Sequence, residues 1–411
     1  MTSPIDRTAQ SSAVTLALAS LLSAAVGALA GLAAAVFLYL LDRVTQSRSD
    51  HGWLVLGLPA AAAVLVWGYA RFGATAGRGM AVILDELSAG EVVPKVPLRM
   101  APMVLAGTLI THLFGGSAGR EGTAVQMGAS IASGVAGLAR APVAVRRLVV
   151  MAGIAGGFAA VFGTPIAGVL FALEVSRRRI AWRQMLMAIV PVIVAATVGD
   201  QVCLALGTVH TSYNAGPALP IDPVLIGKWL AVAVVAAGAA HAYIFLVDRA
   251  RAVGTKISAP TLAAVGGAVI VAAWWALGDT YLGLGVPTIV RAFSDDNLPY
   301  YAFACKLALT AITIGVRMVG GEVTPLFFIG ATLGNALAGL LGLPVALSAA
   351  VTMVAVFAAA ARTPLALIAM AGELFGGHVM IHAAIVIGAT ELLMMRRSIY
   401  PLWPSPAAAA N

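Results

Sequence analysis

The segment Gly115–Gly128, GGSAGREGTAVQMG, places a carboxylate, Glu121, inside a chain that is otherwise apolar. Two glycines, Gly119 and Gly122, flank the Arg–Glu pair and let the backbone turn without a side chain in the way. The residues that follow, TAVQMGASIASGVAGL, predict a helix with Glu121 at or near its N-terminus. A helix N-terminus carries unpaired N–H groups and a partial positive charge, and it therefore binds anions.

A glutamate in that position can occupy the anion site itself. Once its carboxyl group is protonated, it loses the attraction to the helix N-terminus and can move away. The hypothesis that follows is an anion path that the Glu121 carboxylate blocks and that opens when this carboxylate is protonated. For this motif alone the alternative stays open, namely an acid that caps the helix and has no role in transport.

The composition is that of a membrane protein. Of the 411 residues, 61% are hydrophobic and 10% are charged, and the mean hydropathy is +0.96. The core of a water-soluble domain cannot bury so much apolar surface, so we expect lipid to surround much of the chain. The net charge of +8 comes from basic clusters between apolar segments, which is typical of cytoplasmic flanks of membrane helices and argues against a nucleic-acid partner.

No motif for a cofactor, a metal or an enzyme stands out. The two cysteines, Cys203 and Cys305, lie in apolar segments and form no motif. The six histidines are scattered and no HExxH sequence occurs. We therefore expect no metal site, no cofactor and no enzymatic activity.

Apolar segments long enough to cross a bilayer recur along the chain. The predicted long helices are Val14–Leu41, Trp53–Phe72, Met185–Leu206, Val224–Val247, Leu262–Leu277 and Val379–Met395. A polar turn is predicted at Asp42–His51. Because cytoplasmic links carry the excess of Lys and Arg, we place Arg177–Arg183 inside the cell and the loop Gly207–Pro223 outside.

Other apolar segments are short or interrupted. Residues 73–91, GATAGRGMAVILDELSAGE, predict a short re-entrant helix, which is tolerated only inside protein or beside a water-filled cavity. Leu148–Phe162 and Pro165–Val175 predict a helix pair broken at a Thr–Pro step. Val345–Ala361 and Pro364–Leu374 predict a second pair with the same break.

The two halves of the chain, about residues 14–206 and 224–400, resemble each other. GREGTAVQMGASIASGVAGL, from Gly119, is similar to GGEVTPLFFIGATLGNALAGL, from Gly320. The aligned pairs are Glu121 with Glu322, Thr164–Pro165 with Thr363–Pro364, and Glu174 with Glu373. Paired broken segments in two halves indicate a transport site near the membrane midplane. We assign Glu174 and Glu373 to structure, as buried acids at helix ends.

Three motifs resemble those of the CLC family of anion channels and proton-coupled antiporters. GREGTAVQMG resembles its GREGP motif, AGGFAAVFGTPIAGVLFALE its AAxFxAPLAGxLFxxE stretch, and GGEVTP its GGxFxP motif. The resemblance covers about residues 74–400. It implies an all-α polytopic membrane protein with the CLC fold, in which two inverted-topology repeats contain broken and re-entrant helices.

The resemblance also implies an assembly and a location. We expect residues 1–411 to form a single CLC transmembrane domain with no cytoplasmic regulatory domain. The family implies a homodimer with one pore per subunit. The expected location is the lipid bilayer of a bacterial inner cell membrane, crossed several times.

Departures from the family motifs point to fluoride. Met80 stands where the GSGIP motif has its central serine, although Gly77–Arg78 offers a competing alignment. The GGxFxP motif contains Glu322 here, and Val175 stands where chloride/proton antiporters often carry an acid. These changes resemble the CLC-F branch, which exports fluoride in exchange for protons. Ala81 departs from the asparagine typical of that branch.

The function expected from the resemblance is fluoride/proton antiport, with Glu121 as gate and proton carrier. The expected anion contacts are Met80, Ala81, Gly122, Thr123, Val323, Thr324 and Tyr400. Glu322 is expected to bind ions or relay protons, since an ionisable group in the bilayer is costly; the alternative is a structural buried acid. Tyr400 would close the inner end, or alternatively anchor the chain at the interface.

Other functions stay open. The nearest alternative is a chloride/proton antiporter or a passive chloride channel of the same family, which relative fluoride and chloride fluxes would distinguish. An intramembrane enzyme is a more distant alternative, against which the lack of catalytic motifs argues, and a non-transporting membrane sensor is a third.

Overall fold

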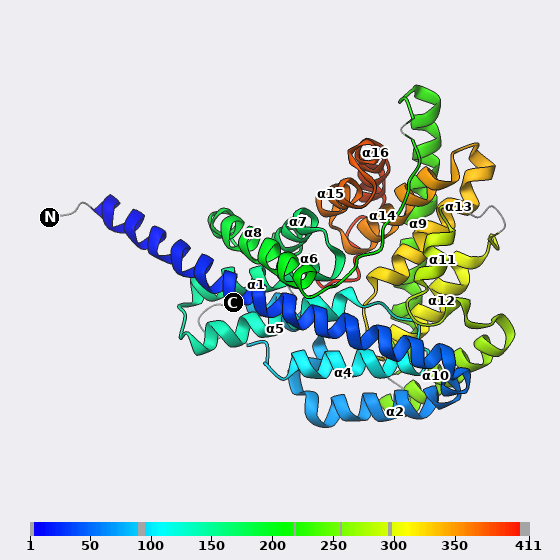
Figure 1. Cartoon of the computed structure of the whole chain (residues 1–411), viewed down its shortest axis with the longest axis horizontal. Coiled ribbons are helices and arrows are strands. Elements are labelled where there is room, and N and C mark those ends of the chain that lie inside the picture. The colour runs from blue at the N-terminus through cyan, green and yellow to red at the C-terminus, as the bar shows by residue number, and fades with distance from the viewer. Residues whose placement is uncertain (1–3, 89–94, 218, 255–256, 295–297, 403–411) are drawn as a thin grey trace.

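The computed structural model describes residues 4–88, 95–217, 219–254, 257–294 and 298–402, and its regular structure there is helical (Figure 1). The helices are Pro4–Asp50 (α1), Leu58–Gly68 (α2), Met80–Ser88 (α3), Met100–Leu113 (α4), Glu121–Leu138 (α5), Val143–Phe162 (α6), Pro165–Ser176 (α7), Trp182–Ala205 (α8), Pro223–Val253 (α9), Ala259–Leu277 (α10), Val286–Arg291 (α11), Ala302–Gly315 (α12), Val323–Leu341 (α13), Val345–Ala361 (α14), Pro364–Phe375 (α15) and Gly377–Leu393 (α16).

Long and short helices follow one another along the chain, but the predicted long helix Val379–Met395 is wrong, because its counterpart α16 has only 17 residues and is among the shorter helices. Within the described residues, seven helical segments are long and apolar enough to cross a membrane. They are Ala13–Asp50, Gly52–Arg78, Val143–Phe162, Trp182–Ala205, Pro223–Val253, Ala259–Leu277 and Val323–Leu341. The helices between them are shorter, so their ends lie within protein, where neighbouring side chains can satisfy the free backbone groups.

The predicted polar turn at Asp42–His51 is wrong, because α1 continues as a helix to Asp50. The segment contains no glycine or proline that would end a helix, and the first glycine after it is Gly52. Polar side chains also pair one turn apart along it, with Gln46 donating to Asp50 at 3.0 Å. Figure 1 shows α1 as one long helix crossing the molecule.

Two helix groups, one from each predicted half of the chain, meet at the turns before α5 and α13: α4–α7 and α12–α15. Gly119 and Gly321 form an antiparallel bridge, with N···O distances of 2.6 Å and 2.7 Å. The bridge joins the turns that precede α5 and α13, so the N-termini of these two helices lie side by side. A Cβ atom on Gly321 would lie 2.9 Å from the Gly122 nitrogen, which explains why glycine is required there.

This bridge corrects the register of the repeat by one residue. The sequence alignment matches Glu121 with Glu322. In the structure Gly119 pairs with Gly321, α5 begins at Glu121 and α13 begins at Val323. The counterpart of Glu121 is therefore Val323. Glu121 and Glu322 therefore do not occupy equivalent positions in the two repeats. The similarity of GREG to GGEV aligns them because both segments contain a glutamate.

The second pair of short helices, α7 and α15, is joined by reciprocal caps. The Glu174 carboxylate accepts the backbone N–H groups of Leu365 at 3.1 Å and Ala366 at 2.8 Å, at the start of α15. The Glu373 carboxylate accepts those at the start of α7, with distances of 2.9 Å and 2.8 Å. Each acid satisfies N–H groups that a helix start leaves free. The predicted placement of both acids at helix ends is confirmed.

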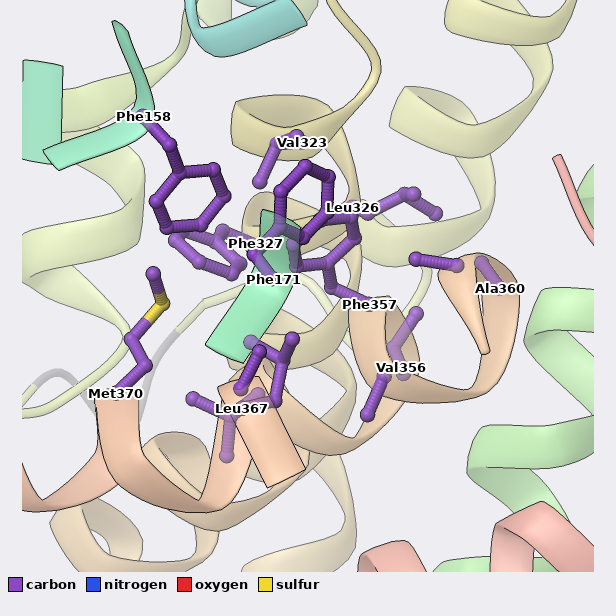
Figure 2. Close-up of a cluster of buried hydrophobic side chains, with 14 of the residues drawn as sticks. Phe158, Phe171, Val323, Leu326, Phe327, Val356, Phe357, Ala360, Leu367 and Met370 are labelled. Atoms are coloured by element: carbon purple, nitrogen blue, oxygen red, sulfur yellow. The ribbon is translucent and has the colours of Figure 1, made fainter. Parts of the chain in front are cut away.

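The core forms where the two repeats pack together. Helices α6 and α14 are buried almost throughout their length. Aromatic rings from both repeats meet there, with Phe158 stacked on Phe171 at 4.5 Å and Phe327 edge-on to Phe357 at 5.7 Å (Figure 2). This cluster supports the first turn of α13, because Val323 and Leu326 lie against it.

Candidate functional site

A small buried cavity lies at the N-termini of α5 and α13. Its volume is about 20 Å³, which is room for roughly one water molecule. The lining residues are Met80, Glu121, Gly122, Val125, Gln126, Phe158, Phe171, Val323 and Tyr400. They come from α3, α5, α6, α7, α13 and the segment after α16, so both repeats contribute.

Glu121 closes one side of this cavity, and the residue is 1% exposed. Thr324 donates to the carboxylate twice, from its backbone nitrogen at 3.1 Å and from its hydroxyl at 2.6 Å. The Arg120 backbone nitrogen lies 3.2 Å from Oε2 and the Arg120 Nε lies 3.5 Å from Oε1. The carboxylate thus occupies the anion site at the N-terminus of α13, the helix of the other repeat.

Met80 lines the cavity from the start of α3. It is the first residue of α3, and Gly79, with φ of +56°, turns the chain into that helix. The predicted re-entrant segment is therefore a short 3₁₀ helix, Ala74–Arg78, followed by α3, and residues 89–91 lie outside the described residues. Ala81 follows Met80 and is partly buried, but it does not line the cavity.

Tyr400 lines the same cavity from the C-terminal segment. Its ring meets Phe171 edge-on, with centroids 6.0 Å apart. The backbone on its N-terminal side is tied to the end of α14, since the Ile399 nitrogen donates to the Ala360 oxygen at 2.9 Å. The tyrosine is therefore held in position by protein contacts around a partly buried ring.

A buried arginine joins the two elements that carry Met80 and Tyr400. Arg179 donates to the Ser88 hydroxyl of α3 at 3.1 Å, and its guanidinium lies 3.6 Å from Asp85. The same side chain donates to the Pro401 carbonyl oxygen, next to Tyr400. Arg179 therefore links α3 to the C-terminal segment.

The remaining sequence-predicted residues lie near the cavity in different ways. Gly122 and Val323 line it. The Thr123 hydroxyl lies 2.6 Å from the Thr108 hydroxyl of α4, so it is already paired with another helix. Glu322 precedes α13, is partly buried and accepts a hydrogen bond from the Tyr243 hydroxyl at 3.0 Å. It does not line the cavity with Glu121.

Sequence reasoning missed four lining residues: Val125, Gln126, Phe158 and Phe171. Gln126 is five residues after Glu121 on α5, and its amide faces Gly79, where a Cβ atom would lie 3.6 Å away. The sequence signal for Gln126 is that it is the one side-chain amide in the segment GREGTAVQMG. The two phenylalanines stand in the AGGFAAVFGTPIAGVLFALE stretch, but the sequence did not indicate which face of α6 and α7 they take.

Comparison with known proteins gives consistent matches. A family model described as voltage gated chloride channel matches residues 61–393. The chain is 44% identical over 393 residues to a chloride/fluoride channel protein of Pseudomonas syringae pv. tomato, covering 92% of this chain and 84% of that protein. A solved CLC-type fluoride/proton antiporter is 31% identical with a TM-score of 0.86, and the match covers 98% of this chain and 99% of that one.

A third match concerns the fold alone. A slow cyanobacterial Cl⁻/H⁺ antiporter is 20% identical with a TM-score of 0.79, and the match covers 92% of this chain and 94% of that one. Fold and site together define a polytopic helical membrane protein that transports anions. The chain belongs to the voltage-gated chloride channel family, the CLC family, which confirms both the predicted family and the predicted fold class.

Proposed function

We propose that this chain exports fluoride in exchange for protons across a bacterial inner membrane. The observation that carries the proposal is the Glu121 carboxylate bound to the backbone and hydroxyl of Thr324 at the start of α13. A carboxylate held there stands in the place of a transported anion. When it binds a proton it no longer competes for the helix N-terminus, and the donors become free for an anion.

Fluoride is favoured over chloride by the chemistry of the cavity. Fluoride is small and holds its water tightly, so a site must replace that water with several hard donors. The Thr324 hydroxyl and the N–H groups of the first turn of α13 are such donors. The serine hydroxyl of the family's chloride motif is replaced by Met80, and the volume is only about 20 Å³.

Proton coupling is assigned to Glu121, with Glu322 as a second acid. Val175, where related antiporters often have an acid, is fully buried. Glu322 is the other carboxylate at the start of α13, and its hydrogen bond from Tyr243 brings α9 into contact with it. Because an ionisable group inside a membrane is costly, its retention there supports a role in transport.

The relatives support this proposal by their descriptions, one as a chloride/fluoride channel protein and one as a CLC-type fluoride/proton antiporter. We further propose that the chain works as a homodimer with one path in each subunit, and that residues 1–411 form one transmembrane domain.

The test is ion flux from liposomes that hold the purified protein, measured with fluoride and chloride electrodes and a proton indicator. Fast fluoride efflux, slow chloride efflux and proton uptake against its gradient are expected. Comparable chloride and fluoride fluxes would instead make this a chloride transporter of the family. Fluoride efflux without proton movement would make it a channel.

A further inference from the structure

One polar side chain on the wall of the cavity has no role in the proposed mechanism. Gln126 of α5 lines the cavity and is partly buried. Within the described residues, its side-chain amide makes no hydrogen bond to another residue. An amide has two N–H donors and one acceptor oxygen, and leaving them unpaired in a buried place costs free energy. Gln126 therefore has donors available to a ligand in the cavity.

The geometry of α5 directs this amide toward the start of the helix. Glu121, Gly122, Val125 and Gln126 all line the cavity, so they form one stripe at the spacing i, i+1, i+4 and i+5. Helical side chains tilt toward the N-terminus, so the Gln126 side chain extends over the turn that contains Gly122. Gly122 has no side chain that would compete for this space. The amide and the Glu121 carboxylate therefore belong to one wall of the cavity.

A second element packs against the other side of the amide. A Cβ atom on Gly79 would lie 3.6 Å from the Gln126 Oε1 and 3.8 Å from its Nε2, so the amide lies against the turn that leads into α3. The next residue, Met80, also lines the cavity. The polar end of Gln126 therefore lies beside the residue that replaces the serine of the family's chloride motif.

Few other groups on the cavity wall can donate to an anion. Of the nine described residues that line it, only Glu121, Gln126 and Tyr400 have polar side chains, and the others are apolar or glycine. Once the Glu121 carboxylate has left, Gln126 and Tyr400 are the lining side chains that remain as donors. Fluoride has to exchange tightly held water for such donors, and an amide supplies one without carrying a charge.

We propose that the side-chain amide of Gln126 is a direct ligand of the transported anion and donates an N–H group to it in the cavity. This inference rests on the proposed export of fluoride, and it adds a binding group from α5 to the donors at the start of α13. When Glu121 leaves, the anion is bound from both helices. Because an amide does not titrate, this donor is present at every pH, unlike the Glu121 carboxylate.

The test is fluoride binding to the purified full-length protein, measured by calorimetry. Gln126→Met keeps the length and the unbranched shape of the side chain but removes both N–H donors. The dissociation constant for fluoride should rise roughly tenfold or more, as expected when a hydrogen bond to a charged group is lost. As a matched control, Gln46→Met makes the same substitution at an exposed amide of α1 and should leave the affinity unchanged.

The same comparison with Glu121→Gln as the parent separates the anion from the gate, because no carboxylate then competes for the site. If the amide binds the anion, Gln126→Met should lower the fluoride affinity by a similar factor in this parent. A loss that occurs only when the Glu121 carboxylate is present would mean that the amide acts on the gate, and the inference would be wrong.

A second variant serves where a melting curve shows that Gln126→Met does not fold. Gln126→Glu has nearly the shape of the amide and places a negative charge in the cavity, so the fluoride affinity at neutral pH should fall roughly tenfold or more. Unchanged affinity in either folded variant contradicts the inference while the proposed function stands. If the parent proteins themselves bind no fluoride, the proposed function has failed and the inference with it.

Discussion

The Thr324 hydroxyl lies 2.6 Å from both carboxylate oxygens of Glu121, although 202 residues separate the two side chains in sequence. The hydroxyl lies between the two oxygens, and the Thr324 backbone nitrogen, 3.1 Å from Oε2, holds the same carboxylate. The threonine therefore holds the carboxylate, and in the proposed mechanism the same hydroxyl becomes a donor to the anion that replaces it.

Replacing Thr324 with alanine should weaken both interactions. A hydrogen bond to a charged group contributes about 1.5–3 kcal/mol, so fluoride affinity and transport rate should fall roughly tenfold or more. Thr324→Ser keeps the hydroxyl and should retain most of the activity. Fluoride titration by calorimetry and liposome efflux measure the two effects. Equal behaviour of the alanine and serine variants would contradict a role for the hydroxyl.

Glu121→Gln should end proton coupling. The amide has nearly the shape of the carboxylate but does not titrate, so fluoride movement should no longer pump protons. The measurement is proton uptake during downhill fluoride efflux, with Asp50→Asn at the exposed end of α1 as control. Continued pumping by Glu121→Gln would show that another group carries the proton.

Met80→Ser should shift selectivity toward chloride. The substitution places a hydroxyl at the start of α3, on the wall of the cavity, and shortens the side chain that occupies it. The ratio of fluoride to chloride efflux should fall by roughly tenfold, about the size that one added donor produces. An unchanged ratio would mean that Met80 is a tolerated replacement and that selectivity originates elsewhere.

Arg179 should act as a positioning residue for the inner end. Arg179 joins α3 to the backbone beside Tyr400, so Arg179→Gln should loosen the positions of Met80 and Tyr400. The maximal transport rate should fall, and the fluoride concentration for half-maximal transport should change. Arg179→Lys keeps the charge and one donor and should restore part of the rate. Arg178→Gln, at the exposed neighbour, is the control. If all three variants transport alike, the link has no role in the path.

Glu322→Gln and Tyr243→Phe test the second acid together. The Tyr243 hydroxyl is 3.0 Å from Glu322, so a proton-relay role predicts that either change lowers the number of protons moved per fluoride. A purely structural acid predicts lower thermal stability with unchanged stoichiometry. Reversal-potential measurements and a melting curve on the same preparations separate the two results.

The sequence predicted most of what is local. Glycines and helix signals around Glu121 located the start of α5, and the Thr–Pro steps located the breaks in both repeats. Contacts between distant segments could not be predicted, because spacing along a chain carries no information on how two helices approach each other. Examples are the contacts of Thr324 with Glu121 and of Arg179 with Pro401.

The errors have equally specific causes. The polar composition of Asp42–His51 predicts a turn, but without glycine or proline its backbone continues the helix to Asp50. The repeat register slipped by one residue, because Glu121 and Glu322 look alike while the bridge that sets the register is made by backbone atoms of Gly119 and Gly321.

The reciprocal caps of α7 and α15 also constrain how the molecule is made. During synthesis Glu174 enters the membrane long before Leu365 and Ala366 exist, and the N–H groups at the start of α7 must wait for Glu373. The first half is therefore inserted with a buried acid and a helix start that lack their partners. We expect it to be a substrate for membrane chaperones or proteases until the second half arrives, so the halves mature only as a pair.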